Sequence, residues 1–165
     1  MLSACLCLQG CSTTKCLSEG QYRLDDVDVV VTDPDGSFQK SSVQQFIRQK
    51  PNSSFLGLNP LVSMYNWGGK FFTKIGEEPV VYSASSTESS RMAMQRHLAY
   101  LGYYDAQVEG KATTSGKLAK VRYEITLGER LHIDSVLFDI PKGGEFEEEF
   151  MADLPNVTLR PGTVL

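Results

Sequence analysis

Cysteine is missing from the sequence after position 16. The chain has 165 residues, and its four cysteines all lie near the N-terminus, as Cys5, Cys7, Cys11 and Cys16. Disulfide bonds therefore cannot hold the body of the protein together. A hydrophobic core must do so, and the chain is 41% hydrophobic, which is enough to build one. The length allows one domain or two small ones.

Clusters of positive charge are also missing. The chain carries 16 Lys and Arg residues against 20 Asp and Glu residues, for a formal net charge of −4. Nucleic-acid binding depends on grouped Lys and Arg side chains that neutralise phosphates. We therefore expect no nucleic-acid partner, and we class the chain with ordinary acidic globular proteins.

The residue patterns of metal sites and catalytic sites are absent from the sequence too. Its two histidines, His97 and His132, are far apart, and the cysteines lack the paired spacing of zinc ligands. No Ser, Cys or Asp is spaced so as to build a nucleophile and base with His97, which we expect to pack in the fold. Phosphate loops, dinucleotide fingerprints and protease motifs do not occur. We expect no metal, no cofactor and no enzymatic activity.

The first residues indicate a lipid anchor. Leu8-Gln9-Gly10-Cys11 has the small residue before cysteine that marks a lipobox, and it resembles the signal end of a bacterial lipoprotein. The resemblance implies that residues 1–10 are a signal-peptide remnant, that Cys11 carries acyl chains such as palmitate, and that residues 11–21 are a tether. Leu2-Ser3-Ala4-Cys5 is a competing box, with almost nothing hydrophobic before it. Two or more acyl chains anchor a protein stably to a membrane.

The clearest local signal is a helix that leads directly into a strand, over residues 85–108. Ser85 and Glu88 have the spacing of a capping box, and an apolar face follows at helical spacing. Gly102 is expected to end the helix in the left-handed conformation. After it, apolar and polar residues alternate from Tyr103 to Glu109, which predicts a strand with one covered face. The apolar helix face consists of Met94, His97, Leu98 and Leu101.

The other elements predict an α+β domain over residues 22–128. Residues 22–31 alternate as a strand, and a slip in phase is explained either by a bulge or by a strand that begins near Asp25. Ser42 and Gln45 form a second capping box for a short helix that Pro51 stops. Residues 110–116 are expected to form a polar turn, followed by an apolar strand over 118–127 that pairs in a hairpin. The order strand, helix, helix, strand, strand gives one small mixed sheet with two helices on one face.

An aromatic-rich connection interrupts this domain at about residues 52–74. Leu61, Met64 and Tyr65 indicate one or two helical turns within it. The segment is either an elaborated connection packed on its own domain or a contact surface for a partner or a membrane. The residues of such a surface would be Tyr65, Trp67, Phe71 and Phe72.

The last segment, residues 129–165, predicts the start of a second unit. Leu131 to Phe138 alternates as a strand, and Phe146, Phe150 and Leu154 follow at helical spacing. The neighbouring glutamates are expected to form a solvated helix face. A second helix and a closing hairpin do not follow, so we expect an incomplete second repeat whose apolar face cannot be buried by the segment alone.

Several of these stretches together resemble a known family. The stretch KIGEEPVVYSASSTESSRMAMQRHLAYLGYYDAQV, continued by LGERLHIDSVLF, resembles the polypeptide-transport-associated (POTRA) domains of BamA- and TamA-type outer-membrane assembly factors. CSTTK and IRQKPNS resemble the lipid-anchored TamA-like proteins of Bacteroidota. In that family such domains precede a membrane-embedded barrel, and we expect this chain to be an N-terminal fragment without it.

The resemblance also implies a location and a function. It places the chain on the periplasmic side of a bacterial outer membrane, anchored by lipid, where such domains bind unfolded outer-membrane protein clients or periplasmic partners. An exposed edge strand can add an extended client as a further strand. The resemblance implies that this edge consists of Tyr104, Asp105, Ala106, Gln107 and Val108. The alternative is a lipid-anchored ligand-binding or structural lipoprotein that uses the aromatic segment.

Overall fold

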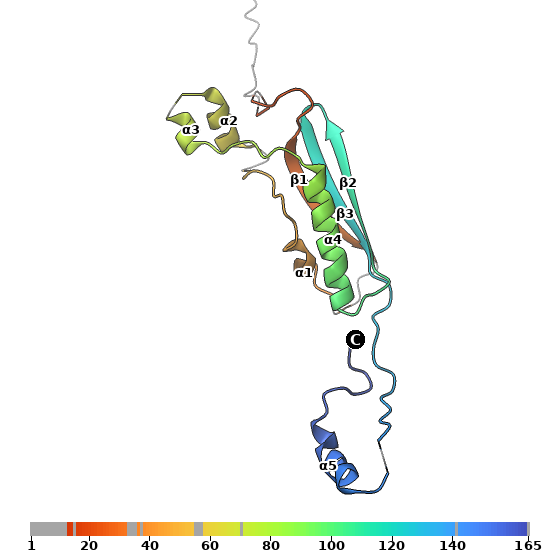
Figure 1. Ribbon diagram of the computed structural model, residues 1–165. Helices are drawn as coiled ribbons and strands as arrows, with labels where there is room; N and C mark the ends of the chain where they lie inside the picture. The colour runs from red at the N-terminus through yellow and green to blue at the C-terminus, as the bar shows by residue number, and fades with distance from the viewer. Residues whose placement is uncertain are drawn as a thin grey trace, which may run out of the picture.

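The fold is seen in a computed structural model (Figure 1). It describes residues 13–14, 16–32, 36, 38–54, 58–69, 71–140 and 142–164. The predictions for residues 1–10 and for Cys11 therefore lie outside the described residues, as do parts of the predicted tether and aromatic segment.

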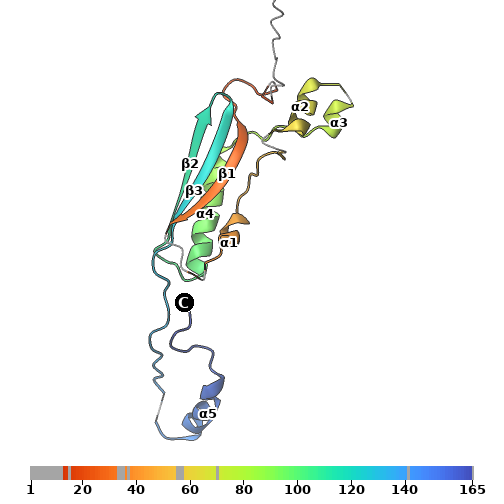
Figure 2. The same ribbon diagram turned by 180° about the vertical axis from the view of Figure 1, so that it is seen from behind.

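A three-stranded mixed sheet forms the centre of the protein (Figures 1 and 2). Its strands are β1 (Arg23–Thr32), β2 (Gln107–Ser115) and β3 (Leu118–Thr126), in the order β1-β3-β2. β3 pairs in parallel with β1 and antiparallel with β2. The helices α1 (Ser41–Gln44) and α4 (Ala84–Tyr100) lie on one face of the sheet. The predicted α+β class and element order are confirmed.

The core lies between this sheet and α4. Side chains from β3 point alternately toward α4 and toward solvent, as the sequence pattern predicts. Met94 and Leu98 from α4 are fully buried against them. The core cluster comprises Leu24, Val29, Val43, Met94, Leu98, Tyr103, Ala106, Val108, Val121, Tyr123, Ile125 and Leu127.

β1 contains a bulge, which is one of the two explanations that the sequence allowed for the slip in phase. Its register against β3 shifts between Leu24 and Asp26, so one residue is extra on β1. The shift lets Leu24 and Val29 both reach the core although they are an odd number of positions apart. The phase slip in the sequence is therefore a real irregularity within one strand.

α4 begins two residues earlier than predicted. Ser83, rather than Ser85, caps it, because the Ser83 Oγ accepts a hydrogen bond of 3.3 Å from the Ser86 N–H. Glu88 pairs instead with Arg91, one turn further along the helix. The predicted capping box is wrong, although the helix itself is confirmed.

Gly102 ends α4 as predicted. Its φ is +92°, in the left-handed region that suits a residue without Cβ. The Tyr103 N–H then donates to the Leu98 carbonyl at 2.9 Å and the Gly102 N–H to that of Ala99 at 3.0 Å, which is the Schellman arrangement. Tyr103 is buried next to Leu98 in the core.

The capping box predicted for the first helix is wrong. Ser42 lies inside α1, where its Oγ donates to the Gln39 carbonyl at 2.7 Å, and Lys40 at the N-cap makes no side-chain bond. The helix is one turn long and ends well before Pro51. Its buried Val43 holds it against the core, so tertiary packing stabilises an element too short to persist by itself.

The hairpin is longer than the sequence indicates. Residues 110–115, predicted as part of a turn, belong to β2, and the turn consists of Gly116 and Lys117 alone. Gly116 has a φ of +58°, which fits the first central position of a two-residue hairpin turn. The stretch is polar because β2 is almost wholly exposed beyond Val108. A polar, exposed strand has the same composition as a loop, so the sequence pattern predicted a turn.

The inserted segment folds into two short helices, α2 (Pro60–Trp67) and α3 (Phe72–Ile75). The predicted helical turns around Leu61 are thereby confirmed. The Glu77 N–H donates to the Leu61 carbonyl at 3.1 Å. Gly76 packs against the Tyr65 backbone so closely that an added Cβ would lie 2.5 Å from the Tyr65 nitrogen. α2 and α3 therefore form one small unit.

The last segment departs from its prediction. Residues 131–138 form no strand, and an isolated bridge joins His132 to Val164. A strand needs a neighbour to pair with, and the described part of this segment offers only that single bridge. The predicted helix is confirmed as α5 (Glu145–Asp153), followed by the 3-10 turn η1 (Leu154–Asn156), but α5 buries none of its residues.

Among the helices that the structure describes, none combines the length and the apolar character needed to cross a membrane.

Candidate protein-binding edge

β2 is an edge strand with one unpaired side. Within the described residues it pairs with β3 and with no other strand. Ser115 and Leu118 flank the two-residue turn and therefore exchange both backbone hydrogen bonds. In an antiparallel pair every second residue points its N–H and C=O groups away from the partner strand. Counted from Ser115, four residues of β2 point these groups away from β3. These residues are Val108, Gly110, Ala112 and Thr114.

Gln95 on α4 covers the first part of this edge. Its Oε1 accepts from the Val108 N–H at 3.1 Å, and its Nε2 donates to the Ala106 carbonyl at 2.5 Å. A primary amide can donate and accept at once, so it satisfies the two backbone groups as a neighbouring strand would. The open part of the edge therefore runs from Gly110 to Thr114.

This placement corrects the boundaries of the predicted edge. Tyr104 and Asp105 lie in the turn after α4, and the Ala106 N–H donates to the Tyr103 carbonyl at 3.3 Å. β2 starts only at Gln107. Tyr104, Asp105 and Ala106 are thus not strand residues, because the chain must complete the turn that Gly102 begins. A binding role for the five predicted residues, of which Gln107 and Val108 belong to β2, stays a prediction.

α4 runs close beside the open edge. An added Cβ at Gly110 would lie 3.2 Å from the Thr87 Cγ2, so the missing side chain allows this approach. Further along α4, a hollow of about 480 Å³ is lined by Arg91, Met92, Gln95 and Arg96. Since Gln95 also bonds β2, the hollow borders the strand.

The hollow carries positive charge from two arginines. Arg91 binds Glu88 through its Nε at 2.8 Å and its Nη2 at 2.6 Å. This side-chain hydrogen bonding lowers the pKa of Glu88 and raises that of Arg91. Arg96 donates from its Nε to the Met92 carbonyl at 3.3 Å and forms no ion pair with an acidic group among the described side chains.

An ion-pair ladder crosses the opposite face of β2 and β3. Lys111 Nζ lies 2.6 Å from the Glu124 Oε2 and 2.9 Å from the Glu109 Oε2. The hydrogen bond to Glu124, with a smaller part from Glu109, raises the pKa of Lys111. The same bond lowers the pKa of Glu124. These exposed pairs fix which side chains lie opposite each other in the hairpin.

The other edge of the sheet, β1, is more fully covered. The Leu24 N–H donates to the Val80 carbonyl at 2.7 Å, and the Tyr82 N–H donates to the Tyr22 carbonyl at 2.8 Å. Further along, the Asp28 carboxylate accepts from the Val29 N–H at 2.8 Å. A side chain that blocks its own edge discourages pairing with another strand. β2 is therefore the better acceptor for a further strand.

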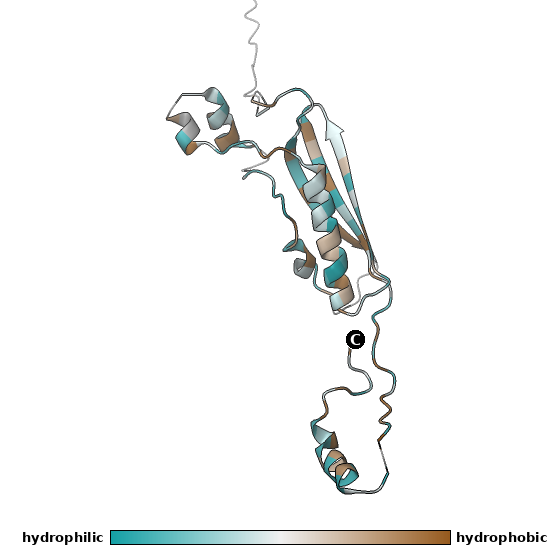
Figure 3. Ribbon diagram, viewed as in Figure 1, coloured by the Kyte–Doolittle hydropathy of each residue, from teal (hydrophilic) through white to brown (hydrophobic). Residues whose placement is uncertain are grey.

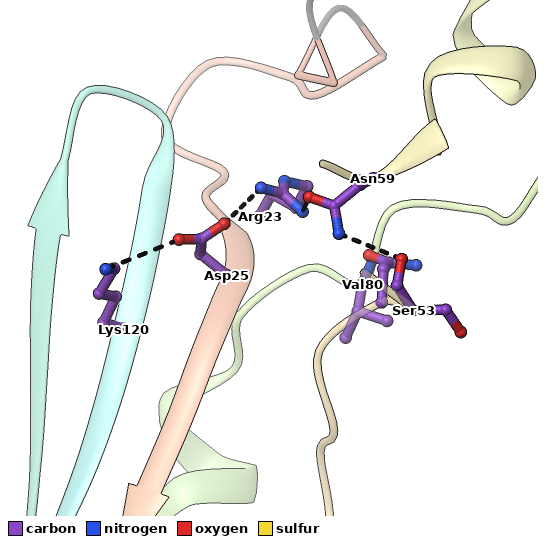
Figure 4. Close-up of polar contacts among 7 residues, drawn as sticks. Arg23, Asp25, Ser53, Asn59, Val80 and Lys120 are labelled. Carbon is purple, nitrogen blue, oxygen red and sulfur yellow. Dashed lines mark hydrogen bonds and ion pairs between the residues drawn. The ribbon is translucent and has the colours of Figure 1, made fainter. Parts of the chain in front are cut away.

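A buried arginine ties the sheet to the inserted helices (Figure 4). Arg23 is 3% exposed, and it donates to the Asp25 Oδ1 at 2.5 Å and to the Asn59 Oδ1 at 2.9 Å. Asp25 also lies 3.9 Å from the Lys120 Nζ, and the Asn59 Nδ2 donates to the Ser53 carbonyl at 3.2 Å. The bulge at Asp25 lets this carboxylate reach both cations.

The predicted aromatic surface is only partly brought together. Trp67 is 65% exposed and Phe71 is 68% exposed. Tyr65 is half-buried against Gly76, so it serves the packing of α2 on α3. The side chain of Phe72 lies outside the described residues.

His97 lies in the fold as a packing residue. Its ring is 4.7 Å from that of Phe46, and its Nε2 is buried without a hydrogen-bond partner among the described atoms. The described residues also contain no group of three His, Cys, Asp or Glu side chains placed to hold a metal ion.

The residue at this candidate edge that sequence reasoning missed is Gln95. Nothing in its local pattern separates it from the other polar residues on α4, since its role depends on backbone groups eleven and thirteen positions further along the chain. Gly110 was expected to begin a polar turn, and only its place in β2 shows that it is a strand glycine beside a closely packed helix.

In the part of the chain that the structure describes, the fold is a small α+β domain with a mixed sheet, and β2 is the more open of its two edge strands. No known protein family, no curated protein and no solved structure matches the chain.

Proposed function

We propose that this domain binds an extended segment of another protein by adding it as a strand beside β2. The observation that carries the proposal is the outer edge from Gly110 to Thr114, which has no strand partner in the described structure. Unpaired N–H and C=O groups on an edge are a template for a further strand. The edge is short and flanked by charge, which limits uncontrolled pairing.

The edge alone supports only weak association. Three residues of β2 present outward groups, and each net hydrogen bond contributes about 0.5–1.5 kcal/mol before ordering costs. An affinity near 1 mM corresponds to roughly 4 kcal/mol, so backbone pairing by itself is of that order. Side-chain contacts with the hollow on α4, which Met92 and Arg96 line, would add affinity and selectivity.

The partner class follows from the sequence resemblance to POTRA domains. We propose that the domain lies on the periplasmic side of a bacterial outer membrane, anchored through Cys11, and that it binds unfolded outer-membrane proteins or periplasmic partners during their assembly. The order β1, α1, α4, β2 and β3, into which α2 and α3 are inserted, and the open edge support this proposal. A client whose own strands are still unpaired would supply the extended segment.

The test replaces one outward-facing residue of β2. In Ala112→Pro the edge loses an N–H that β3 does not use, so the fold should survive. Ala112→Ser keeps that N–H and is the matched control. Binding of a urea-unfolded outer-membrane protein, diluted into buffer, is followed by fluorescence anisotropy, with circular dichroism as the check on folding.

We expect at least a tenfold loss of binding in Ala112→Pro and none in Ala112→Ser. Equal binding by two folded variants would show that edge pairing is the wrong mechanism. A complete lack of binding by the parent protein would contradict the proposed client class.

A further inference from the structure

The inserted unit of α2 and α3 exposes large apolar side chains. We call residues 58–75 the α2–α3 unit. Trp67 and Phe71 are 65% and 68% exposed, and Leu58 and Ile75 are 70% and 48% exposed. Figure 3 shows hydrophobic colouring on both helices. Four large apolar side chains in so short a unit exceed the scattered exposure that ordinary surfaces show.

The charge of this unit is opposite to that of the chain. Its charged residues are Lys74 and, outside the described residues, Lys70, whereas the whole chain has a net charge of −4. Glu77 and Glu78 follow at its base, where the Glu77 Oε2 accepts from the Ser53 N–H at 3.1 Å. Tryptophan and phenylalanine with lysine nearby are the side chains that favour the boundary between water and an anionic lipid bilayer. An acidic protein would otherwise be repelled by such a surface, so the local excess of lysine favours this unit as the point of contact.

The unit lies at the end of the sheet from which the N-terminal segment leaves. Figures 1 and 2 both place α2 and α3 at the end where β2 turns into β3. Arg23, at the start of β1, binds Asn59 at the base of α2. At the same end the Lys117 Nζ donates to the Leu17 carbonyl at 3.0 Å.

This position is close to the proposed lipid attachment. Leu17 is buried against the domain and follows Cys11 by six residues, which span at most about 22 Å when fully extended. Acyl chains on Cys11 would therefore hold this end of the sheet near the bilayer. α5 lies at the opposite end in both views.

We propose that the α2–α3 unit contacts an anionic lipid bilayer by placing Trp67 and Phe71 in its interface. The contact is separate from acylation and from strand addition at β2. It would set the orientation of the domain, with α2 and α3 toward the lipid and the end of the sheet beyond Gly102 pointing away. Acyl chains alone restrain distance and leave the domain free to rotate.

The experiment uses the full chain with Cys11→Ser, so that no acyl chain contributes. Trp67 is the only tryptophan of the protein, and its fluorescence reports the proposed contact directly. The probe is vesicles of phosphatidylethanolamine and phosphatidylglycerol, with pure phosphatidylcholine vesicles for comparison. Lipids brominated on the upper part of the acyl chain serve as quenchers.

We expect a blue shift of the Trp67 emission and quenching by the brominated lipids, both stronger with the anionic vesicles. Phe71→Ser should lower vesicle partitioning about tenfold, the factor that corresponds to losing a buried aromatic side chain. The control is Leu137→Ser, which removes an apolar side chain that is 92% exposed in the last segment, at the other end of the molecule. It should leave partitioning unchanged.

Two results would overturn the proposal. One is an unchanged Trp67 emission at saturating anionic vesicles. The other is equal partitioning of the folded Phe71→Ser and parent chains. A blue shift caused by added periplasmic proteins and not by vesicles would assign the α2–α3 unit to a protein partner instead. Loss of strand addition in Ala112→Pro has no bearing on these outcomes.

Discussion

The side-chain amide of Gln95 takes the place of a neighbouring strand beside Val108. It accepts from the Val108 N–H at 3.1 Å and donates to the Ala106 carbonyl at 2.5 Å. Both backbone residues are buried, at 5% and 3% exposure, so neither group can turn to water instead. A helix side chain thus decides where the open edge of β2 begins.

Gln95→Ala should therefore destabilise the domain. Two buried backbone groups lose their partners, and each such loss costs about 1–3 kcal/mol, less where water enters the space. We expect a lower midpoint in urea unfolding, with an unchanged slope. Arg96→Ala, one residue further on the exposed side of α4, is the control and should change the free energy of unfolding by less than about 0.5 kcal/mol. Equal stability of Gln95→Ala and the parent would contradict the role assigned to the amide.

Arg23→Met should weaken both the sheet and its link to α2. The buried guanidinium bonds Asp25 and Asn59, and hydrogen bonds with charged groups contribute about 1.5–3 kcal/mol. We expect a loss of about 2–3 kcal/mol in the free energy of unfolding, because Asp25 is part-exposed and keeps Lys120 nearby. Hydrogen exchange in α2 should also become faster.

Lys120→Met provides the comparison for that variant. Lys120 reaches the same carboxylate but is 64% exposed, so its removal should cost no more than about 1 kcal/mol. If Lys120→Met proved as damaging as Arg23→Met, the burial of Arg23 would not be what makes its ion pair important.

The Glu124 carboxyl should titrate below its ordinary pKa of 4.5, because Lys111 donates a hydrogen bond to its ionised form. A lowered pKa in the folded state stabilises the fold above the ordinary pKa, and this contribution is lost as the pH falls through the lowered value. Carbon-detected NMR titration of the carboxyl group measures the midpoint. In Lys111→Met the midpoint should rise, whereas Lys120→Met should leave it in place. An equal Glu124 midpoint in the parent and in Lys111→Met would show that the ion-pair ladder does not form in solution.

Cys11→Ala should abolish incorporation of radiolabelled palmitate in a bacterial host that processes lipoproteins. The thiol of the lipobox cysteine is the attachment point that the sequence predicts. Cys5→Ala, Cys7→Ala and Cys16→Ala are matched controls and should still be labelled. Persistent labelling of Cys11→Ala, with loss of labelling in Cys5→Ala, would show that Cys5 is the acylated cysteine.

The sequence predicts the elements whose signals are local. The apolar face of α4 and its end at Gly102 follow from spacing and from the need for a left-handed residue. The alternation in β3 identifies a strand with one covered face. The phase slip in residues 22–31 indicated an irregularity near Asp25, and the structure shows that it is a bulge. Each of these signals depends on residues that lie close to one another in the sequence.

The misplaced elements show where local signals fail. Ser85 has the spacing of a capping residue, yet Ser83 caps α4, since several serines compete and the position of the helix on the sheet decides among them. β2 looks like a turn from Gly110 onward because an exposed edge strand has the polarity of a loop. Residues 131–138 alternate like a strand but form none.

The sequence by itself determined the α+β order, the junction at Gly102 and the polar character of β2, because these depend on backbone preferences and on the periodicity of neighbouring residues. Only the tertiary structure decided that β3 is central, that β2 is the open edge, and that Gln95 closes its first part. A strand becomes central or exposed through partners that are distant in the sequence, and no local pattern specifies those partners.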